Sequence, residues 1–308
     1  MVSGESKVHT FRWRDALRAV FQDVRIVQVD QIESLGTEDY VFSTPMDTVT
    51  LELVERFPAA KHIAISNALD MMDSNRFSKL VSNNSILERA FDIWVDTDWA
   101  VNAICSLGIN KVTKLPWGLM LPSPELKSLQ KKNSGSGLLI PRLGNENFQP
   151  QVIFETLRTP GSLTQWSHIV TVGMPKEFAN LLVSNVDIEF THFPLVEERE
   201  LLELMDDTQE VLFAPKTDGV SVTMLQALYM GKSVLTTPTI GATEWSRIAP
   251  NVHISKGFEV ADVQNLLIGY KRDDSIKSRD VSVAAVEVNA NLVNNIRVRM
   301  TQLLKKSK

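Results

Sequence analysis

The sequence predicts an α/β protein with two Rossmann-like parallel-sheet domains, and three observations lead to this fold class. Short runs of apolar, β-branched residues alternate with segments of helical period along most of the chain, as they do in βαβ units. A length of 308 residues is enough for two domains. Between the two series of strands and helices, residues 127–137 read KSLQKKNSGSG, a composition typical of an exposed linker.

The first half of the chain contains the less regular series of elements. We expect strands at Val24–Val29, Tyr40–Phe42, His62–Ile65 and Ile93–Val95, and helices around Asp47–Arg56, Arg76–Ala90 and Asp98–Leu107. A short strand in residues 111–114 then leads into a segment with three prolines, where the sheet should end because proline donates no backbone hydrogen bond.

The second half repeats the alternation more regularly. We expect strands at Leu138–Ile140, His168–Thr171, Ile188–Thr191, Val211–Ala214, Ser233–Thr236 and His253–Ile254, and helices at Val152–Leu157, Lys176–Val183, Glu197–Met205, Val222–Met230 and Val260–Ile268. The predicted domains are residues 1–125 and 137–280, joined by a linker at 126–136 and followed by a C-terminal helix, one long or broken, at 281–308. Two such domains face each other across a cleft, where ligands lie beyond the carboxyl ends of the strands.

Composition excludes several classes of protein. A net charge of -5 gives no global positive field, so nucleic acid is not an expected partner. A single cysteine, Cys105, excludes a disulfide framework and a thiolate-rich metal site, and it fits a cytoplasmic location. We find no secretory signal and no apolar run long enough to span a bilayer, so membrane contact is at most peripheral.

The basic C-terminal end allows two interpretations. Its cations either meet an acidic surface or lie on a solvated helix, where they complement the helix dipole. These cations are Arg297, Arg299, Lys305, Lys306 and Lys308.

The most informative segment is residues 211–245, VLFAPKTDGVSVTMLQALYMGKSVLTTPTIGATEW. It predicts a buried strand, a loop with Asp218 and Gly219, a helix that begins near Ser221, and Gly231 at the helix end. A helix N-terminus presents free N–H groups and a positive dipole, a favourable setting for phosphate that is worth about 0.3–1 kcal/mol per anion. A purely structural strand, loop and helix is the alternative interpretation.

This segment resembles the donor-binding signature of retaining glycosyltransferases of the GT-B architecture. In that family a loop Glu and a helix Glu are followed by a Gly-x-Pro-Val pattern; here the corresponding residues are Asp218, Gln226 and Gly231-Lys232-Ser233-Val234, with Glu244 further on. The strand and Arg142 in Leu138–Leu143 resemble the start of the family's second domain, and residues 111–118 resemble the end of its first.

The resemblance implies a nucleotide-sugar donor bound by the second domain, an unidentified acceptor on the side of a reduced first domain, and no metal or other cofactor. Asp218 would contact sugar hydroxyls and Arg142 would neutralise the diphosphate, so these two are the candidate catalytic residues. Gly219, Val220 and Ser221 would offer backbone N–H groups, Gln226 would face the ribose, and Glu244 would complete the donor site.

Three departures from the family pattern bear on donor binding. Asp218 is one methylene shorter than the family's Glu, and Gln226 is neutral. Because a charge-assisted hydrogen bond contributes about 1.5–3 kcal/mol and a neutral one about 0.5–1.5, the neutral amide weakens donor binding by about 1 kcal/mol. No Lys follows Arg142 in residues 143–151, and we expect Lys216 to replace it at the phosphates.

The departures leave two functions open. The first is a metal-independent, retaining glycosyltransferase, and the second is a GT-B-shaped binding or partner subunit without activity. An epimerase or phosphorylase needs acid–base residues or a cofactor lysine that we do not locate. The carboxylates of Asp96-Thr97-Asp98 are an alternative metal pair, although the helical pattern that follows favours Asp98 as a helix cap.

Overall fold

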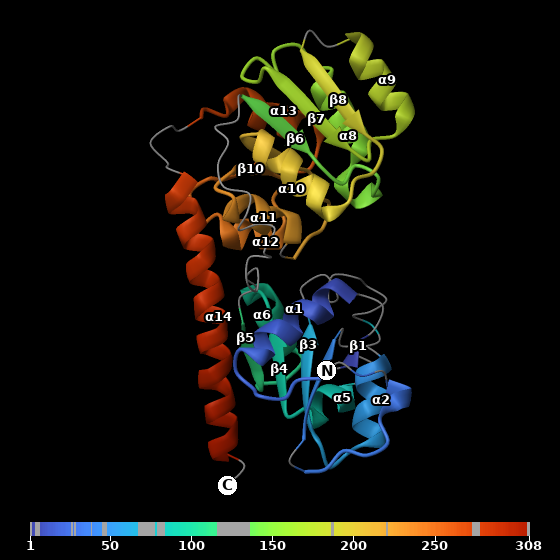
Figure 1. Ribbon diagram of the computed structural model, residues 1–308, viewed down its shortest axis with the longest axis vertical. Helices are drawn as coiled ribbons and strands as arrows, with labels where there is room; N and C mark the ends of the chain where they lie inside the picture. Colours follow the sequence, from blue (N-terminus) through green and yellow to red (C-terminus); the bar gives the residue numbers. More distant parts are fainter. Residues whose placement is uncertain are drawn as a thin grey trace. The chain divides into compact units, whose positions relative to one another are not determined.

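The computed structural model describes residues 2–3, 7–25, 27, 29–37, 39–44, 48–66, 78, 84–115, 136–185, 188–219, 221–272 and 278–306. Contacts divide the chain into two compact units. Unit 1 comprises Met1–Leu121 together with Glu287–Lys308, and unit 2 comprises Pro122–Val286. Each unit contains one sheet, and every pair of neighbouring strands in both sheets is parallel (Figure 1). The C-terminal end of the chain therefore belongs to the same unit as its beginning.

The sheet of unit 1 has its strands in the order of the sequence, β1-β2-β3-β4-β5. Its strands are β1 (Val2–Ser3), β2 (Tyr40–Thr44), β3 (Lys61–Ser66), β4 (Asp92–Val95) and β5 (Val112–Lys114). Its helices are α1 (Lys7–Arg18), α2 (Thr48–Arg56), α5 (Asn84–Arg89) and α6 (Asp98–Ser106), joined by the 3-10 helix η1 (Val29–Gln31). Four of the five strands follow the sequence prediction closely.

The strand predicted at Val24–Val29 is not found among the residues of that segment that the structure describes, which leave out Ile26 and Gln28. Val27 forms a β-bridge, and Val29 begins η1. The edge strand is Val2–Ser3, which pairs with Ser43 and Thr44 of β2. Helix α1 was not predicted, because charged residues interrupt its apolar face. Trp13, Ala16 and Leu17 nevertheless recur at helical spacing and are buried.

Two further details of unit 1 differ from expectation. Thr97, and not Asp98, caps α6: its side chain accepts a hydrogen bond from the Ala100 N–H at 3.2 Å. Asp98 lies in the first turn and forms an ion pair with Lys114 at 2.8 Å. The helix expected at Arg76–Ala90 is described only at Asn84–Arg89 and at residue 78.

The last helix, α14 (Ser278–Lys306), is a single helix of 29 residues. Its Arg299 donates two hydrogen bonds, at 2.8 and 2.6 Å, to the fully buried carboxylate of Asp92 at the start of β4. Arg297 donates to the carbonyl of Ala19 at 2.9 Å. These two cations are therefore bound within unit 1. The solvated-helix interpretation therefore does not describe Arg299, whereas Arg297 remains exposed on the helix.

The sheet of unit 2 has the order β11-β10-β9-β6-β7-β8. Its strands are β6 (Gly137–Ile140), β7 (His168–Val172), β8 (Glu189–Phe193), β9 (Glu210–Phe213), β10 (Ser233–Thr236) and β11 (Val252–Ile254). Its helices are α8 (Pro150–Leu157), α9 (Lys176–Asn185), α10 (Glu198–Asp207), α11 (Val222–Tyr229), α12 (Ile240–Trp245) and α13 (Val260–Gly269), with the 3-10 helix η2 (Glu146–Phe148). The sequence predicted all six strands; α12 and η2 were missed.

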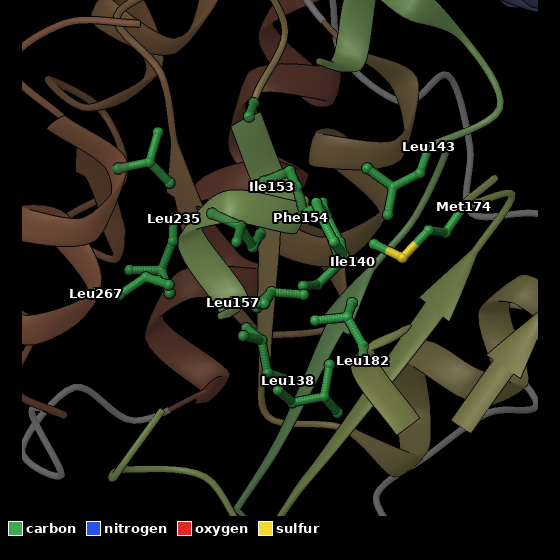
Figure 2. Close-up of a cluster of buried hydrophobic side chains, with 14 of the residues drawn as sticks. Leu138, Ile140, Leu143, Ile153, Phe154, Leu157, Met174, Leu182, Leu235 and Leu267 are labelled. Atoms are coloured by element: carbon green, nitrogen blue, oxygen red, sulfur yellow. The ribbon is translucent and has the colours of Figure 1, made fainter. Parts of the chain in front are cut away.

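The core of unit 2 explains why its strands read as continuous apolar runs. Leu138 and Ile140 of β6 lie in one cluster with residues of α8, α9 and α13 (Figure 2), whereas α10 packs on β6 and α11 packs on β9 and β10. Leu139, between the two, is also fully buried. A parallel sheet that is covered on both faces buries every residue of its central strands.

A buried carboxylate anchors this sheet at the start of β9. Glu210 is fully buried and accepts two hydrogen bonds from Arg272, at 2.8 and 2.9 Å. Trp166 Nε1 and Tyr270 Oη also donate to it, at 3.1 and 3.3 Å. These bonds give the buried charge the partners that it needs.

Candidate functional site

The strand order of unit 2 marks the location of a ligand site. In chain order its strands lie 3-2-1-4-5-6 across the sheet, so the direction of winding reverses between β6 and β9. Ligands of open parallel sheets bind at such a reversal, beyond the carboxyl ends of the two strands. Arg142 follows the end of β6, and Asp218 follows the end of β9. The topology therefore brings the two predicted catalytic residues to the same edge of the sheet.

The loop after β9 leads directly into α11, a helix whose interior is almost wholly buried. Ser221 is the N-cap: it has extended backbone angles, and its Oγ accepts from the Met224 N–H at 3.4 Å. At the other end Gly231 has a φ of 74°. The Gly231 N–H donates to the Leu228 carbonyl and the Lys232 N–H donates to the Ala227 carbonyl, both at 2.9 Å, and these bonds end the helix. The predicted helix start and glycine stop are both confirmed.

Asp218 lies at the centre of this loop with only 7% of its surface exposed. Burial raises the pKa of its carboxyl to about 6. The charge of Arg142, the Ser221 hydroxyl and the Gly219 N–H all act in the opposite direction, because they favour the carboxylate. Asp218 is thus a poorly solvated acid held among donors, the kind of perturbed group that is typical of functional sites.

Arg142 is held in an unusual backbone conformation. Its φ is 67°, in the left-handed region that residues with a Cβ rarely adopt. The guanidinium lies over the ring of Phe148, with 5.9 Å from Cζ to the ring centroid, and the side chain remains exposed. Partial desolvation lowers its pKa, while the charges of Asp218 and Glu198 raise it. The guanidinium therefore lies within electrostatic reach of both carboxylates.

The loop after β6 is tied to the loop after β9 by one asparagine. Asn147 Nδ2 donates to the Thr217 carbonyl at 2.7 Å, and Asn147 Oδ1 accepts from the N–H and the hydroxyl of Thr217, both at 3.1 Å. The Asn147 carbonyl accepts from the Lys216 N–H at 2.7 Å. Gln149 adds a further bond to the Ala214 carbonyl at 2.9 Å. The sequence analysis missed both residues, since no local pattern shows which distant loop an amide will meet.

A close approach of two backbones fixes the other side of the Arg142 loop. Gly173, after β7, has a φ of 80°, and a Cβ placed on it would lie 2.7 Å from the Gly144 nitrogen. The Leu143 N–H donates to the Val172 carbonyl at 2.9 Å. The loop that carries Arg142 is thus held between the loops after β7 and β9.

The remaining predicted donor-site residues lie around this centre. Gly219 is buried with its N–H directed to the Asp218 carboxylate, and Val220 is outside the described residues. Lys216 is exposed next to Thr217. Glu244 is half-buried on α12, whose Gly241 N–H donates to the Asp218 carbonyl at 3.4 Å.

Gln226 is the one predicted residue whose side-chain partner changes the description of the site. It is 3% exposed, and its Nε2 donates to Glu198 Oε1 on α10 at 2.7 Å. Glu198 itself is exposed in the first turn of that helix. A carboxylate therefore lies beside the neutral helix position after all, although it comes from a different element.

In the part of the chain that the structure describes, no three His, Cys, Asp or Glu side chains are grouped in a way that could hold a metal ion. No helix among the same residues has the length and apolar character needed to cross a membrane.

Comparison with known proteins identifies the fold. No family model and no curated protein matches the sequence. Among solved structures, the HepE protein of Anabaena, in complex with UDP and glucose, is 13% identical with a TM-score of 0.61, and the alignment covers 92% of this chain and 86% of that one. A UDP-forming α,α-trehalose-phosphate synthase from Burkholderia xenovorans, in complex with glucose-6-phosphate, is 11% identical with a TM-score of 0.63, over 97% and 79%.

A sucrose-phosphate synthase from Thermosynechococcus elongatus is 13% identical with a TM-score of 0.60, over 84% of this chain and 70% of that one. At these identities the likeness shows the fold, which is that of glycosyltransferases of the GT-B architecture. The predicted fold class, α/β with two Rossmann-like parallel sheets, is confirmed.

The close approach at Gly173 predicts a difference between two glycine substitutions. Gly161 has a similar φ of 84° but nothing within 4 Å of an added Cβ, so Gly161→Ala carries only the left-handed strain of about 1–2 kcal/mol. Gly173→Ala also pushes a methyl group against the Gly144 backbone, which costs about 1–3 kcal/mol more. Urea unfolding of the two variants measures the difference, and equal losses would show that the Gly173 contact is not tight.

The raised pKa of Asp218 predicts a pH-dependent effect on stability. Below about pH 4 the carboxyl is protonated in both the folded and the unfolded state. Between about pH 4 and 6 the unfolded chain loses the proton while the folded chain keeps it, so stability falls as the pH rises. A shift of about two pKa units corresponds to on the order of 3 kcal/mol.

Asp218→Asn removes this titration and keeps a similar side-chain shape. From pH 4 to pH 7 the wild type should lose on the order of 3 kcal/mol of unfolding free energy relative to the variant. Urea unfolding at several pH values gives this difference, in which all other titrating groups cancel. A difference that does not vary with pH would contradict the raised pKa.

Proposed function

We propose that this protein is a glycosyltransferase that moves a sugar from a nucleoside-diphosphate donor to an acceptor. The proposal rests on the residues at the point where the winding of the unit 2 sheet reverses. There the buried acid Asp218, in the loop that leads into α11, lies within electrostatic reach of Arg142, whose guanidinium is stacked on Phe148. A cation and a helix N-terminus are suited to a diphosphate, and an adjacent carboxyl group is suited to sugar hydroxyls.

The chemical role of these residues is to stabilise the leaving group. Arg142, the N-terminus of α11 and Lys216 take up the negative charge that develops on the diphosphate as the sugar departs. Because this loop is preformed by its bonds to Asn147, little reorganisation is needed when charge develops. Cationic side chains perform the work that a bound metal does elsewhere, so we propose a metal-independent reaction.

The proposed transfer exchanges one bond at the anomeric carbon for another. The bond between the sugar C1 and the diphosphate oxygen breaks, and its electron pair stays on the diphosphate. The oxygen of an acceptor hydroxyl forms the new bond to C1, and its proton passes to the released diphosphate. Asp218 accepts hydrogen bonds from donor-sugar hydroxyls and fixes the sugar in place. Retention of the anomeric configuration rests on the family resemblance of residues 211–245.

Two of the compared structures concern UDP by name: HepE was solved with UDP and glucose, and the trehalose-phosphate synthase is UDP-forming. We therefore propose UDP-sugars as the first donors to examine. The single cysteine, exposed on α6, supports a cytoplasmic location.

A donor-hydrolysis assay tests the function and separates it from the inactive binding subunit. An active enzyme should slowly release nucleoside diphosphate from one member of a panel of UDP-, GDP- and ADP-sugars even without acceptor. The same donor at a hundred times its Kd should stabilise the fold by about 2.7 kcal/mol, measured as a thermal shift. A thermal shift without turnover would identify the binding subunit, and neither effect at millimolar concentration would refute a nucleotide-sugar site.

Lys216 and Arg142 give a sharper prediction. Because both cations are proposed to contact the diphosphate, Lys216→Ala and Arg142→Ala should weaken nucleoside-diphosphate binding to a similar degree, about 1.5–3 kcal/mol each, or tenfold and more. Lys271→Ala, which removes an exposed lysine beyond the end of α13, is the control and should bind normally. Wild-type affinity in Lys216→Ala, measured by titration calorimetry, would remove Lys216 from the site.

A further inference from the structure

We propose that Glu198 is the residue that recognises the ribose of the donor, and that Gln226 holds it in position. This inference rests on the proposed function and assigns the nucleoside part of the same site. A ribose carries two neighbouring hydroxyl groups, and a carboxylate accepts hydrogen bonds from both at once. Glu198 provides such a carboxylate near the proposed diphosphate-binding site. It lies on α10, a helix that was not predicted to take part in donor binding.

Gln226 and Glu198 are in direct contact. Gln226 is buried on α11 and donates its Nε2 proton to Glu198 Oε1 at 2.7 Å. An ionised carboxylate has about four acceptor positions, and this bond uses one of them. Glu198 is exposed, so its second oxygen is open to a ligand. A buried amide that fixes an exposed carboxylate restricts its rotamers before any ligand arrives, which lowers the entropy cost of binding.

Glu198 is also placed where the ribose of a donor would lie. Glu198 acts electrostatically on Arg142, as Asp218 does, so both carboxylates lie near the cation that is proposed to bind the diphosphate. Gln226 is five residues beyond the N-cap Ser221, which corresponds to about 7.5 Å of helix rise. In a nucleoside diphosphate the ribose is bonded directly to the diphosphate. A ligand with its diphosphate at Ser221 and Arg142 therefore extends its ribose along α11 toward Gln226 and Glu198.

The simpler interpretation is that Glu198 only complements the dipole of α10. Its position in the first turn does favour a negative charge. Glu200 has the same advantage in the same turn and is also exposed, but two residues of separation place it on a different face of the helix. If the charge only complemented the helix dipole, Glu198 and Glu200 would have the same role. If Glu198 binds the ribose, substitution of Glu198 alone should change ribose recognition.

The test compares each ribonucleotide with its 2′-deoxy counterpart: UDP with dUDP, ADP with dADP and GDP with dGDP. The wild type should bind one ribonucleotide about tenfold more tightly than its deoxy form, because the deoxy form lacks one of the two charge-assisted bonds. Glu198→Gln keeps the shape and the amide contact but removes the charge. It should reduce the preference to about twofold, while Glu200→Gln should keep the wild-type ratio.

The informative quantity is the ratio of the affinity for a ribonucleotide to the affinity for its 2′-deoxy form. Removing a negative charge near Arg142 strengthens diphosphate binding in the ribo and deoxy forms alike, and this common effect cancels. Binding of the deoxy form also shows that the variant is folded. If Glu198→Gln keeps the wild-type preference while nucleotides still bind, Glu198 has no ribose role and the proposed function stands. If no nucleotide binds to the wild type, the proposed function fails, and this inference fails with it.

Discussion

The burial of one ionisable side chain, Asp218, beside the cation of Arg142 is the constraint around which the candidate site is built. Removing a carboxylate from water is costly unless donors and a positive charge replace the lost hydration. Here the Ser221 hydroxyl, the Gly219 N–H and Arg142 provide that replacement. Burial nevertheless raises the pKa of Asp218 to about 6, because desolvation outweighs these three contributions. A desolvated acid with a raised pKa lowers stability locally at neutral pH, and such groups are typical of ligand-binding sites.

The two ends of β9 carry charged groups with different roles: the group at its start stabilises the fold, and the groups after its end form the candidate site. At its first residue, Glu210 is enclosed by Arg272, Trp166 and Tyr270, so this buried charge is fully partnered. Beyond its last residue the chain enters the loop of Asp218, where Lys216 is exposed and desolvation raises the pKa of Asp218. The first arrangement fixes the strand, and the second leaves groups available to a ligand. Parallel sheets of this type bind their ligands at the carboxyl ends of the strands, which agrees with the division seen here.

Sequence reasoning recovered local patterns and missed contacts between distant segments. The strands of unit 2 were predictable because a sheet buried on both faces produces unbroken apolar runs, and the start and end of α11 were predictable from Ser221 and Gly231. Val24–Val29 has a similar apolar pattern, yet its described part contains a β-bridge at Val27 and no strand, because strand pairing depends on partners that its own sequence does not specify. Asn147 and Glu198 were missed for the same reason: each acts on a residue far away in the chain.

The central claim is that the start of α11 and Arg142 together bind a diphosphate. A crystal structure of the protein grown with UDP tests this most directly. The account predicts that the phosphate oxygens lie within hydrogen-bond distance of the Arg142 guanidinium and of the backbone N–H groups at the start of α11. A nucleotide bound elsewhere on the protein, or an Arg142 side chain that points away from the phosphates, would contradict it.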